Sequence, residues 1–166
     1  MQSIKIFTTG GTIDKVYFDA KSTYEVGSPN IERVLSELPL SIEYSVSSVL
    51  RKDSLEITDE DRKIILQAVR DAEEDRIIIT HGTDTMVATA KVLRGVEGKT
   101  IVLTGAIEPA LFKTSDAIFN IGCAIAAVQA LPSGSYITMN GKVFDSDNVV
   151  KDLSISRFVT LDEIDN

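Results

Sequence analysis

The sequence predicts an α/β protein, a three-layer sandwich in which helices cover both faces of a mainly parallel central sheet. Short β-branched segments alternate with single segments of helical period through roughly residue 140. The segment at residues 77–79 is three isoleucines, as expected of a parallel strand buried on both faces. Several strand segments run directly into glycines, and no linker or repeat divides the 166 residues. We therefore expect one domain over residues 1–166.

The first elements follow from apolar runs and the residues that interrupt them. Residues 4–7 predict a buried strand that stops at the glycine turn of residues 8–12, and residues 13–27 predict a loop. Ser28 and Pro29 predict the start of a helix that Pro39 ends, with one apolar face made of Ile31, Val34, Leu35 and Leu38.

The next strand and helix are predicted over residues 42–74. Apolar and polar residues alternate over residues 42–50, which favours a strand, and the polar run at residues 51–54 favours a loop. Thr58 predicts a helix N-cap, because the carboxylates at residues 59–61 favour the positive end of a helix dipole. This helix is expected to end near Glu74, with an inner face made of Ile64, Ile65, Ala68 and Val69.

The alternation continues through the middle of the chain. The strand at residues 77–79 leads into the run HGTDT at residues 81–85, and a helix is predicted from there to Gly95. Residues 100–103 predict another strand, which ends at Gly105. Ser115 predicts the cap of a helix whose inner face would carry Ile118, Ile121, Ile125 and Val128.

The last elements are predicted to be strands. Residues 135–139 form the next strand, and Asn140 and Gly141 predict a hairpin turn into residues 142–144. This hairpin and residues 155–160 are expected to add edge strands to the sheet.

Composition excludes several classes of function. The chain has 17 basic and 25 acidic residues, a net charge of −8 and a pI near 4.7, which argues against nucleic acid as the partner. No run approaches the ~18 apolar residues of a membrane span, and no early stretch is typical of a signal peptide, so we expect a cytoplasmic protein with no membrane partner. A single cysteine and a single histidine cannot form an internal disulfide or a cysteine-rich zinc site.

Two predicted strand ends carry unusual short sequences, at the edge where such sheets bind ligands. The paired glycines at residues 10–11 allow close backbone approach and present Thr12, either to a ligand or as the surface threonine of a tight turn. After Gly82, backbone N–H groups could bind an oxyanion and Asp84 a substrate ammonium; alternatively, Thr83 or Asp84 caps the helix. Neither run matches a dinucleotide or triphosphate motif.

Three other residues have ordinary structural interpretations when taken alone. His81 is expected to be a packed imidazole that is hydrogen-bonded to backbone. Cys123 is expected to be a small buried hydrophobe. Lys151 is expected, from its position alone, to be a solvated lysine.

The two motifs TGGTI at residues 9–13 and HGTDTM at residues 81–86 together resemble the signature motifs of the bacterial L-asparaginase/glutaminase family. Further matches follow in order, at residues 22–27, 53–54 and 104–106, at Asp116 with residues 119–120, and at residues 139–140 leading to Lys151. The similarity spans nearly the whole chain but only the amino-terminal domain of the family. It therefore implies a short, single-domain asparaginase.

The resemblance implies an amidohydrolase that converts L-asparagine to L-aspartate and ammonia without a metal or organic cofactor. Thr12 would be the nucleophile, with Tyr24 beside it to help move its proton. Thr83 and Lys151, held by Asp84, would form a second catalytic cluster. The substrate would be bound with Asp84 on its α-ammonium and Ser54 on its α-carboxylate, in a site made of Gly11, Asp53, Ser54, Thr83 and Asp84.

The sequence also departs from the family. Glu108 stands before Pro109 where the family commonly has an arginine, and residues 151–154 differ from the usual threonine-rich continuation. Lack of the second domain would remove an acidic residue that a neighbouring subunit contributes, which implies a more open site. A homodimer or higher homo-oligomer is expected. Two alternative functions stay open, a non-catalytic amino-acid-binding module and a hydrolase of another small amide.

Overall fold

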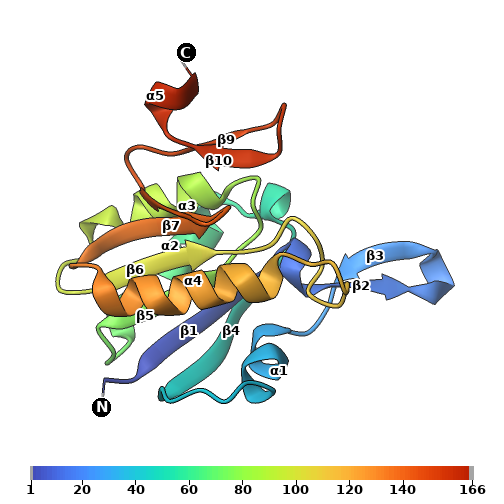
Figure 1. Ribbon diagram of the computed structural model, residues 1–166, viewed down its shortest axis with the longest axis horizontal. Coiled ribbons are helices and arrows are strands. Elements are labelled where there is room, and N and C mark those ends of the chain that lie inside the picture. Colours follow the sequence, from blue (N-terminus) through green and yellow to red (C-terminus); the bar gives the residue numbers. More distant parts are fainter. Residues whose placement is uncertain (1, 165–166) are drawn as a thin grey trace.

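The computed structural model describes residues 2–164 and contains one central sheet (Figure 1). Its spatial order is β4-β1-β5-β6-β7-β8, and every neighbouring pair is parallel except β7 with β8. The strands are β1 (Ile4–Gly10), β4 (Tyr44–Lys52), β5 (Arg76–Thr80), β6 (Thr100–Thr104), β7 (Gly134–Met139) and β8 (Lys142–Asp145). The predicted α/β class with a mainly parallel sheet is confirmed.

Helices cover both faces of the sheet. Helices α1 (Ile31–Ser36) and α4 (Ala117–Ala130) pack on one face, and α2 (Asp59–Asp71) and α3 (Met86–Val92) on the other. A hydrophobic core lies on each face of the sheet, and alternate residues of β5 point into the two cores. Ile78 packs with α1 and α4, while Ile77 and Ile79 pack with α2 and α3. This double burial explains the isoleucine run.

The ends and faces of α2 and α4 differ in part from the prediction. The Thr58 cap is confirmed, with Asp61 completing a capping box, but α2 ends at Asp71 and not near Glu74. Ile64 and Ile118, which were expected on inner faces, are 52% and 53% exposed. Each of these two side chains therefore lies on the solvent side of its helix. Cys123 is half-buried on α4, so its predicted burial is only partly correct.

Two predicted helix starts shift along the chain. Helix α1 begins at Ile31 after Asn30, not at Ser28, because Asn30 N–H donates to Asp14 Oδ1 at 2.8 Å in a tertiary contact. Helix α4 begins at Ala117, whose N–H donates to the predicted cap Ser115 Oγ at 3.0 Å. Tertiary partners therefore decide where the first turn can close.

The predicted loop at residues 13–27 is wrong, because this segment forms a β-hairpin. A short 3₁₀ turn (Thr12–Asp14) leads into β2 (Lys15–Phe18), which pairs antiparallel with β3 (Thr23–Val26) in a separate two-stranded sheet. The hairpin projects from the body of the protein in Figure 1. Both of its faces are largely solvated, so the sequence lacks the buried alternation that usually indicates strands.

The chain after β7 is only partly as predicted. Asn140 and Gly141 form the expected turn with φ of 55° and 75°, and β8 is the expected edge strand. Residues 155–160 do not extend the main sheet, because β10 (Arg157–Val159) pairs with β9 (Val150–Asp152) in a separate ribbon before α5 (Leu161–Ile164). Burial of Phe158 against the α2/α3 side of the core holds this ribbon in place. No helix within residues 2–164 is long and apolar enough to cross a membrane.

Candidate functional site

The loops that follow β1, β4 and β5 meet at the carboxyl edge of the sheet, and glycines set how closely they pack. A Cβ on Gly11, which has a φ of +88°, would lie 2.4 Å from Gly82 N. A Cβ on Gly82 would lie 2.6 Å from Ser54 Cβ. Thr85 Oγ1 also donates to the Ser54 carbonyl at 2.7 Å. The structure therefore brings together three loops that are far apart in the sequence.

Lys151, Thr83 and Asp84 form a compact polar cluster at this edge. Lys151 Nζ donates to Thr83 Oγ1 at 2.8 Å and to Asp84 Oδ1 at 2.7 Å. The Lys151 side chain is 15% exposed and that of Asp84 40% exposed, so the ion pair is shielded on one side and open on the other. Lys151 is thus not the solvated lysine expected from its position alone. Strand β9 carries it here, with Phe158 as its pairing partner.

The hydrogen-bond directions in this cluster bear on its chemistry. An ammonium can only donate, so Thr83 Oγ1 accepts from Lys151 and its own hydrogen is available to another group. Lys151 contacts one carboxylate oxygen of Asp84, and this partly exposed carboxylate suits an external ammonium. The cluster therefore combines a carboxylate that can bind a cation, on Asp84, with a hydroxyl group that can donate its hydrogen, on Thr83.

Thr12 begins the 3₁₀ turn directly after Gly11 and is half-buried. Gly11 N–H donates to the Lys52 carbonyl at 2.9 Å, which fixes the loop against the end of β4. The contact between Gly11 and Gly82 places the Thr12 turn beside the loop that carries Thr83. Two residues on, burial raises the pKa of Asp14 to about 6, although the Asn30 N–H and the Arg51 cation oppose this rise.

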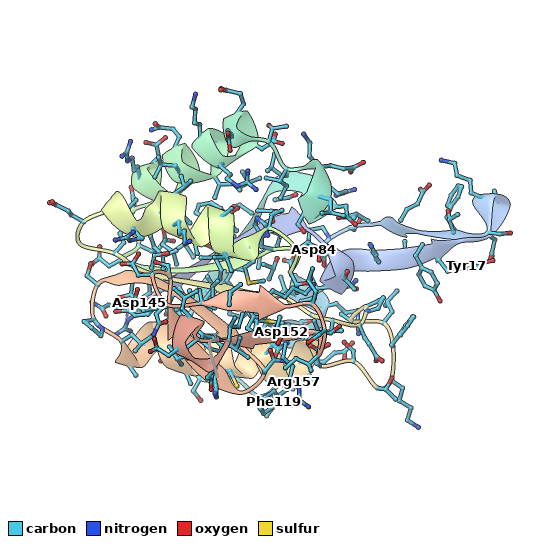
Figure 2. The ribbon with its side chains drawn as sticks, turned by 90° about the horizontal axis from the view of Figure 1, so that it is seen from above. Tyr17, Asp84, Phe119, Asp145, Asp152 and Arg157 are labelled. Atoms are coloured by element: carbon cyan, nitrogen blue, oxygen red, sulfur yellow. The ribbon has the colours of Figure 1, made fainter. Side chains whose placement is uncertain are left out.

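Tyr24 lies on the projecting hairpin and is half exposed. Its ring centroid is 5.4 Å from that of Tyr17 and 5.7 Å from that of Phe112. Figure 2 shows Tyr17 on the projecting hairpin, well away from Asp84. Tyr24 therefore has aromatic neighbours on the hairpin and at Phe112, and its place beside Thr12 stays a prediction of the family resemblance.

Asp53 and Ser54 have structural partners of their own. Asp53 Oδ1 accepts from Leu55 N–H at 3.1 Å, and its other oxygen pairs with Lys15 Nζ at 3.1 Å. Burial opposes ionisation of Asp53, but the Leu55 N–H and the Lys15 cation outweigh it and lower the pKa of the carboxyl group. Ser54 is almost fully buried against Gly82. A hollow of about 380 Å³ lies next to this turn, lined in part by Lys15, Asp53 and Tyr24.

Behind the site lie buried polar residues that were not among the predicted site residues. His81 is a packed imidazole, as predicted, but it also contacts Thr89 on α3, which in turn contacts Arg62 on α2. A signal was present, because Arg62 and Thr89 occupy helix positions three residues from the core residues Ile65 and Met86. Within residues 2–164, no group of three or more His, Cys, Asp or Glu side chains is arranged to hold a metal ion.

Comparisons with known proteins identify the family. A family model described as "Asparaginase, N-terminal" matches residues 3–164. The glutaminase-asparaginase of Pseudomonas fluorescens biotype A is 30% identical over 172 residues, covering 93% of this chain and 47% of that protein. L-asparaginase 2 of Escherichia coli K12 is 29% identical over 164 residues, covering 91% of this chain and 47% of that protein.

A solved structure agrees with this assignment. The thermostable L-asparaginase from Thermococcus kodakarensis superposes with a TM-score of 0.83 at 27% identity, covering 95% of this chain and 51% of that chain. The present chain thus spans about half the length of the relatives it matches. Because the family model covers almost every residue, the chain belongs to the asparaginase family, in which it corresponds to the amino-terminal domain.

Proposed function

We propose that this chain hydrolyses the side-chain amide of L-asparagine to L-aspartate and ammonia, with Thr12 as the nucleophile. The observation that carries the proposal is the cluster of Thr83, Asp84 and Lys151, which lies beside the loop that presents Thr12. Amide hydrolysis needs a hydroxyl nucleophile, donors for a tetrahedral oxyanion and a proton for the departing ammonia. The names of the relatives add support.

The proposed reaction has two steps. Thr12 Oγ1 attacks the carboxamide carbon and loses its proton, with Tyr24 assigned to this transfer by the family resemblance. The C–N bond then breaks, the nitrogen takes up a proton, and ammonia leaves a β-aspartyl ester on Thr12. Water attacks the ester carbon, which releases L-aspartate and restores the hydroxyl group. The Thr83 hydroxyl and its Lys151 donor would supply protons and positive charge near the reacting amide.

Substrate binding follows from the same cluster. Asp84, with one carboxylate oxygen on Lys151, would accept from the α-ammonium group. Ser54 would donate to the α-carboxylate at the adjoining turn, and backbone N–H groups beside Thr12 and Thr83 would bind the oxyanion. L-glutamine, which is longer by one methylene, should react about 10- to 200-fold more slowly in kcat/KM if the pocket fits asparagine.

An ammonia-release assay on the purified full chain tests this proposal. Thr12→Ala and Thr83→Ala should each lower kcat by at least about 100-fold. Lys151→Ala should lower kcat to a similar extent. Lys91→Ala removes the same charge from an exposed position on α3 and should keep wild-type activity. Wild-type kcat in Thr12→Ala or Thr83→Ala would contradict the proposed mechanism. Substitution of the exposed Thr114 by alanine serves as the threonine control.

A second candidate function is a non-catalytic module that binds an amino acid. What favours it is the partly exposed Asp84 carboxylate, which can bind an ammonium group whether or not Thr12 reacts. Calorimetric titration with L-asparagine separates the two candidates, because the module binds without releasing ammonia. A panel of L-glutamine and other small amides, scored by ammonia release, tests the remaining alternative of a different amide substrate.

We further propose that the protein is cytoplasmic and assembles as a homodimer or higher homo-oligomer. Support for assembly comes from α4, which has no charged residue and exposes 53% of Ile118 and 58% of Phe119. Light scattering on the purified chain measures the assembly directly, and a mass equal to one chain at all concentrations would contradict it.

A further inference from the structure

A chain of buried polar groups runs from α2 through α3 to the loop that carries Thr83. Arg62 Nε lies 3.1 Å from Thr89 Oγ1, which lies 2.8 Å from His81 Nε2. His81 Nδ1 lies 2.7 Å from the Gly82 carbonyl oxygen. His81 and Thr89 have no exposed surface, and Arg62 is 8% exposed. Burial of a guanidinium and an imidazole is unfavourable unless each hydrogen bond is satisfied, so this arrangement calls for an explanation.

The chemistry of the groups fixes the direction of two of these hydrogen bonds, and the charge state of His81 sets the third. A carbonyl oxygen only accepts, so His81 Nδ1 must carry a hydrogen and donate it to Gly82. Arg62 Nε–H only donates, so Thr89 Oγ1 accepts from it and keeps its own hydrogen for donation to an unprotonated His81 Nε2. Because Arg62 already places a buried positive charge beside Thr89, a second positive charge on the buried ring is unfavourable, and we assign His81 as the neutral tautomer with hydrogen on Nδ1. Consistently, burial lowers its pKa to about 4; the Gly82 carbonyl opposes this, and the Arg62 cation adds to it.

Fixing the Gly82 carbonyl also fixes the next peptide N–H. The described residues contain no cis peptide bond, and in a trans peptide the C=O and N–H groups point in opposite directions. Because the Gly82 carbonyl points to the buried imidazole, the Thr83 N–H points away from it. The Thr83 side chain is held independently by Lys151.

We propose that Arg62, Thr89 and His81 form a positioning relay that orients the Gly82–Thr83 peptide, so that Thr83 N–H donates to the amide oxygen of the substrate. His81 acts through Gly82 and does not touch the substrate. The catalytic part of this inference rests on the proposed amidohydrolase function. The orientation of the relay itself does not depend on that function.

The first experiment measures the tautomer of His81 without substrate. The sequence has one histidine, so ¹⁵N-histidine labelling of the full chain gives an unambiguous NMR signal. We expect the neutral Nδ1–H tautomer from pH 5 to pH 8. The ¹⁵N chemical shift of Nε2 should change in Thr89→Val and return to the wild-type value in Thr89→Ser. An Nε2–H tautomer, or titration near pH 6.5, would overturn the relay.

The second experiment uses two amide replacements that differ in which ring nitrogen they imitate. The Asn side-chain amide sits where Nδ1 was and can donate to Gly82, whereas the longer Gln amide sits nearer the Nε2 position. We expect His81→Gln to lower kcat by about 10- to 100-fold with KM within about twofold, and His81→Asn to keep most of kcat. Equal losses in both variants would mean a packing role and would overturn the proposal.

Two further readouts keep the outcomes distinct. If the His81 variants do not fold, Thr89→Val and Thr89→Ser provide the same comparison, and recovery of kcat by serine alone supports the relay. If the wild-type protein releases no ammonia from any amide, the proposed function fails. The relay is then judged by the tautomer and by the Thr83 amide resonance, which should shift in His81→Gln and not in His81→Asn.

Discussion

Asp14→Asn should stabilise the protein at neutral pH, and the effect should vanish in acid. Asp14 is 2% exposed at the foot of the β2–β3 hairpin, where its backbone carbonyl accepts from Gly27 N–H at 2.8 Å. Its Oδ1 accepts from Asn30 N–H at 2.8 Å. Asparagine can accept the same hydrogen bond through its own Oδ1 and carries no charge. The substitution therefore removes the penalty of ionising a buried carboxyl group.

The size and sign of the effect follow from the pKa shift. Burial raises the pKa of Asp14 from 3.8 to about 6. A shift of about 2 units corresponds to about 3 kcal/mol of unfolding free energy. Above pH 6 the carboxyl group is ionised in both states and the full penalty applies. As the pH falls from 6 to 4 the folded state takes up the proton first, so the penalty disappears. Asp14→Asn should therefore gain about 2–3 kcal/mol at pH 8 and almost nothing near pH 4.

Urea unfolding at pH 4, 6 and 8 measures this difference. The chain has no tryptophan and four tyrosines, so far-ultraviolet circular dichroism and tyrosine fluorescence are suitable probes. Asp19→Asn, at the exposed tip of the same hairpin, removes the same charge and should stay within about 0.5 kcal/mol of wild type. A gain for Asp14→Asn that is equal at pH 4 and pH 8, or no greater than that of the control, would show that ionisation of buried Asp14 does not destabilise the protein.

Three further predictions concern packing and caps. Gly11→Ala places a Cβ 2.4 Å from the neighbouring loop, so it should lower the free energy of unfolding by more than about 2 kcal/mol and abolish ammonia release. Gly122→Ala, which has open space on α4, should instead raise the free energy of unfolding by about 0.5–1 kcal/mol. Thr58→Ala removes the N-cap of α2 and should cost about 1 kcal/mol in a urea titration; a change below about 0.3 kcal/mol would contradict the capping role. Ile65→Ala should lower the free energy of unfolding by about 2–5 kcal/mol, and the adjacent Ile64→Ala by less than about 1 kcal/mol. The reason is that Ile65 is fully buried whereas Ile64 is 52% exposed. Equal melting temperatures of the two variants would contradict this prediction.

The strands of the main sheet could be predicted because their signals are local. The isoleucines at residues 77–79 and the glycines after β1 and β6 need no distant partner to be recognised. The hairpin at residues 15–26 could not be recognised in this way. Its strands bury little, and they are held by antiparallel pairing and by the cross-strand contact of Tyr17 with Tyr24.

The candidate site likewise contains residues that local patterns indicate and one residue that they do not. The positions of Thr12, Thr83 and Asp84 at strand ends were predicted from glycine runs and a family resemblance. Spacing alone left Lys151 as a solvated lysine, since its partners Thr83 and Asp84 lie 68 and 67 residues away in the chain. The chemical roles of these residues stay predictions that the activity assays test.

The parallel α/β architecture and the edge of the sheet where the unusual loops end can be recognised from local patterns, because hydrophobic periodicity and glycine positions are properties of neighbouring residues. Which polar groups meet at that edge depends on the folded arrangement of the chain. The Arg62–Thr89–His81 relay joins α2, α3 and the end of β5, and Asp14 acquires its altered pKa from burial beneath a hairpin. Hydrogen-bond direction and desolvation depend on atoms brought close in space, and no local pattern in the sequence encodes them.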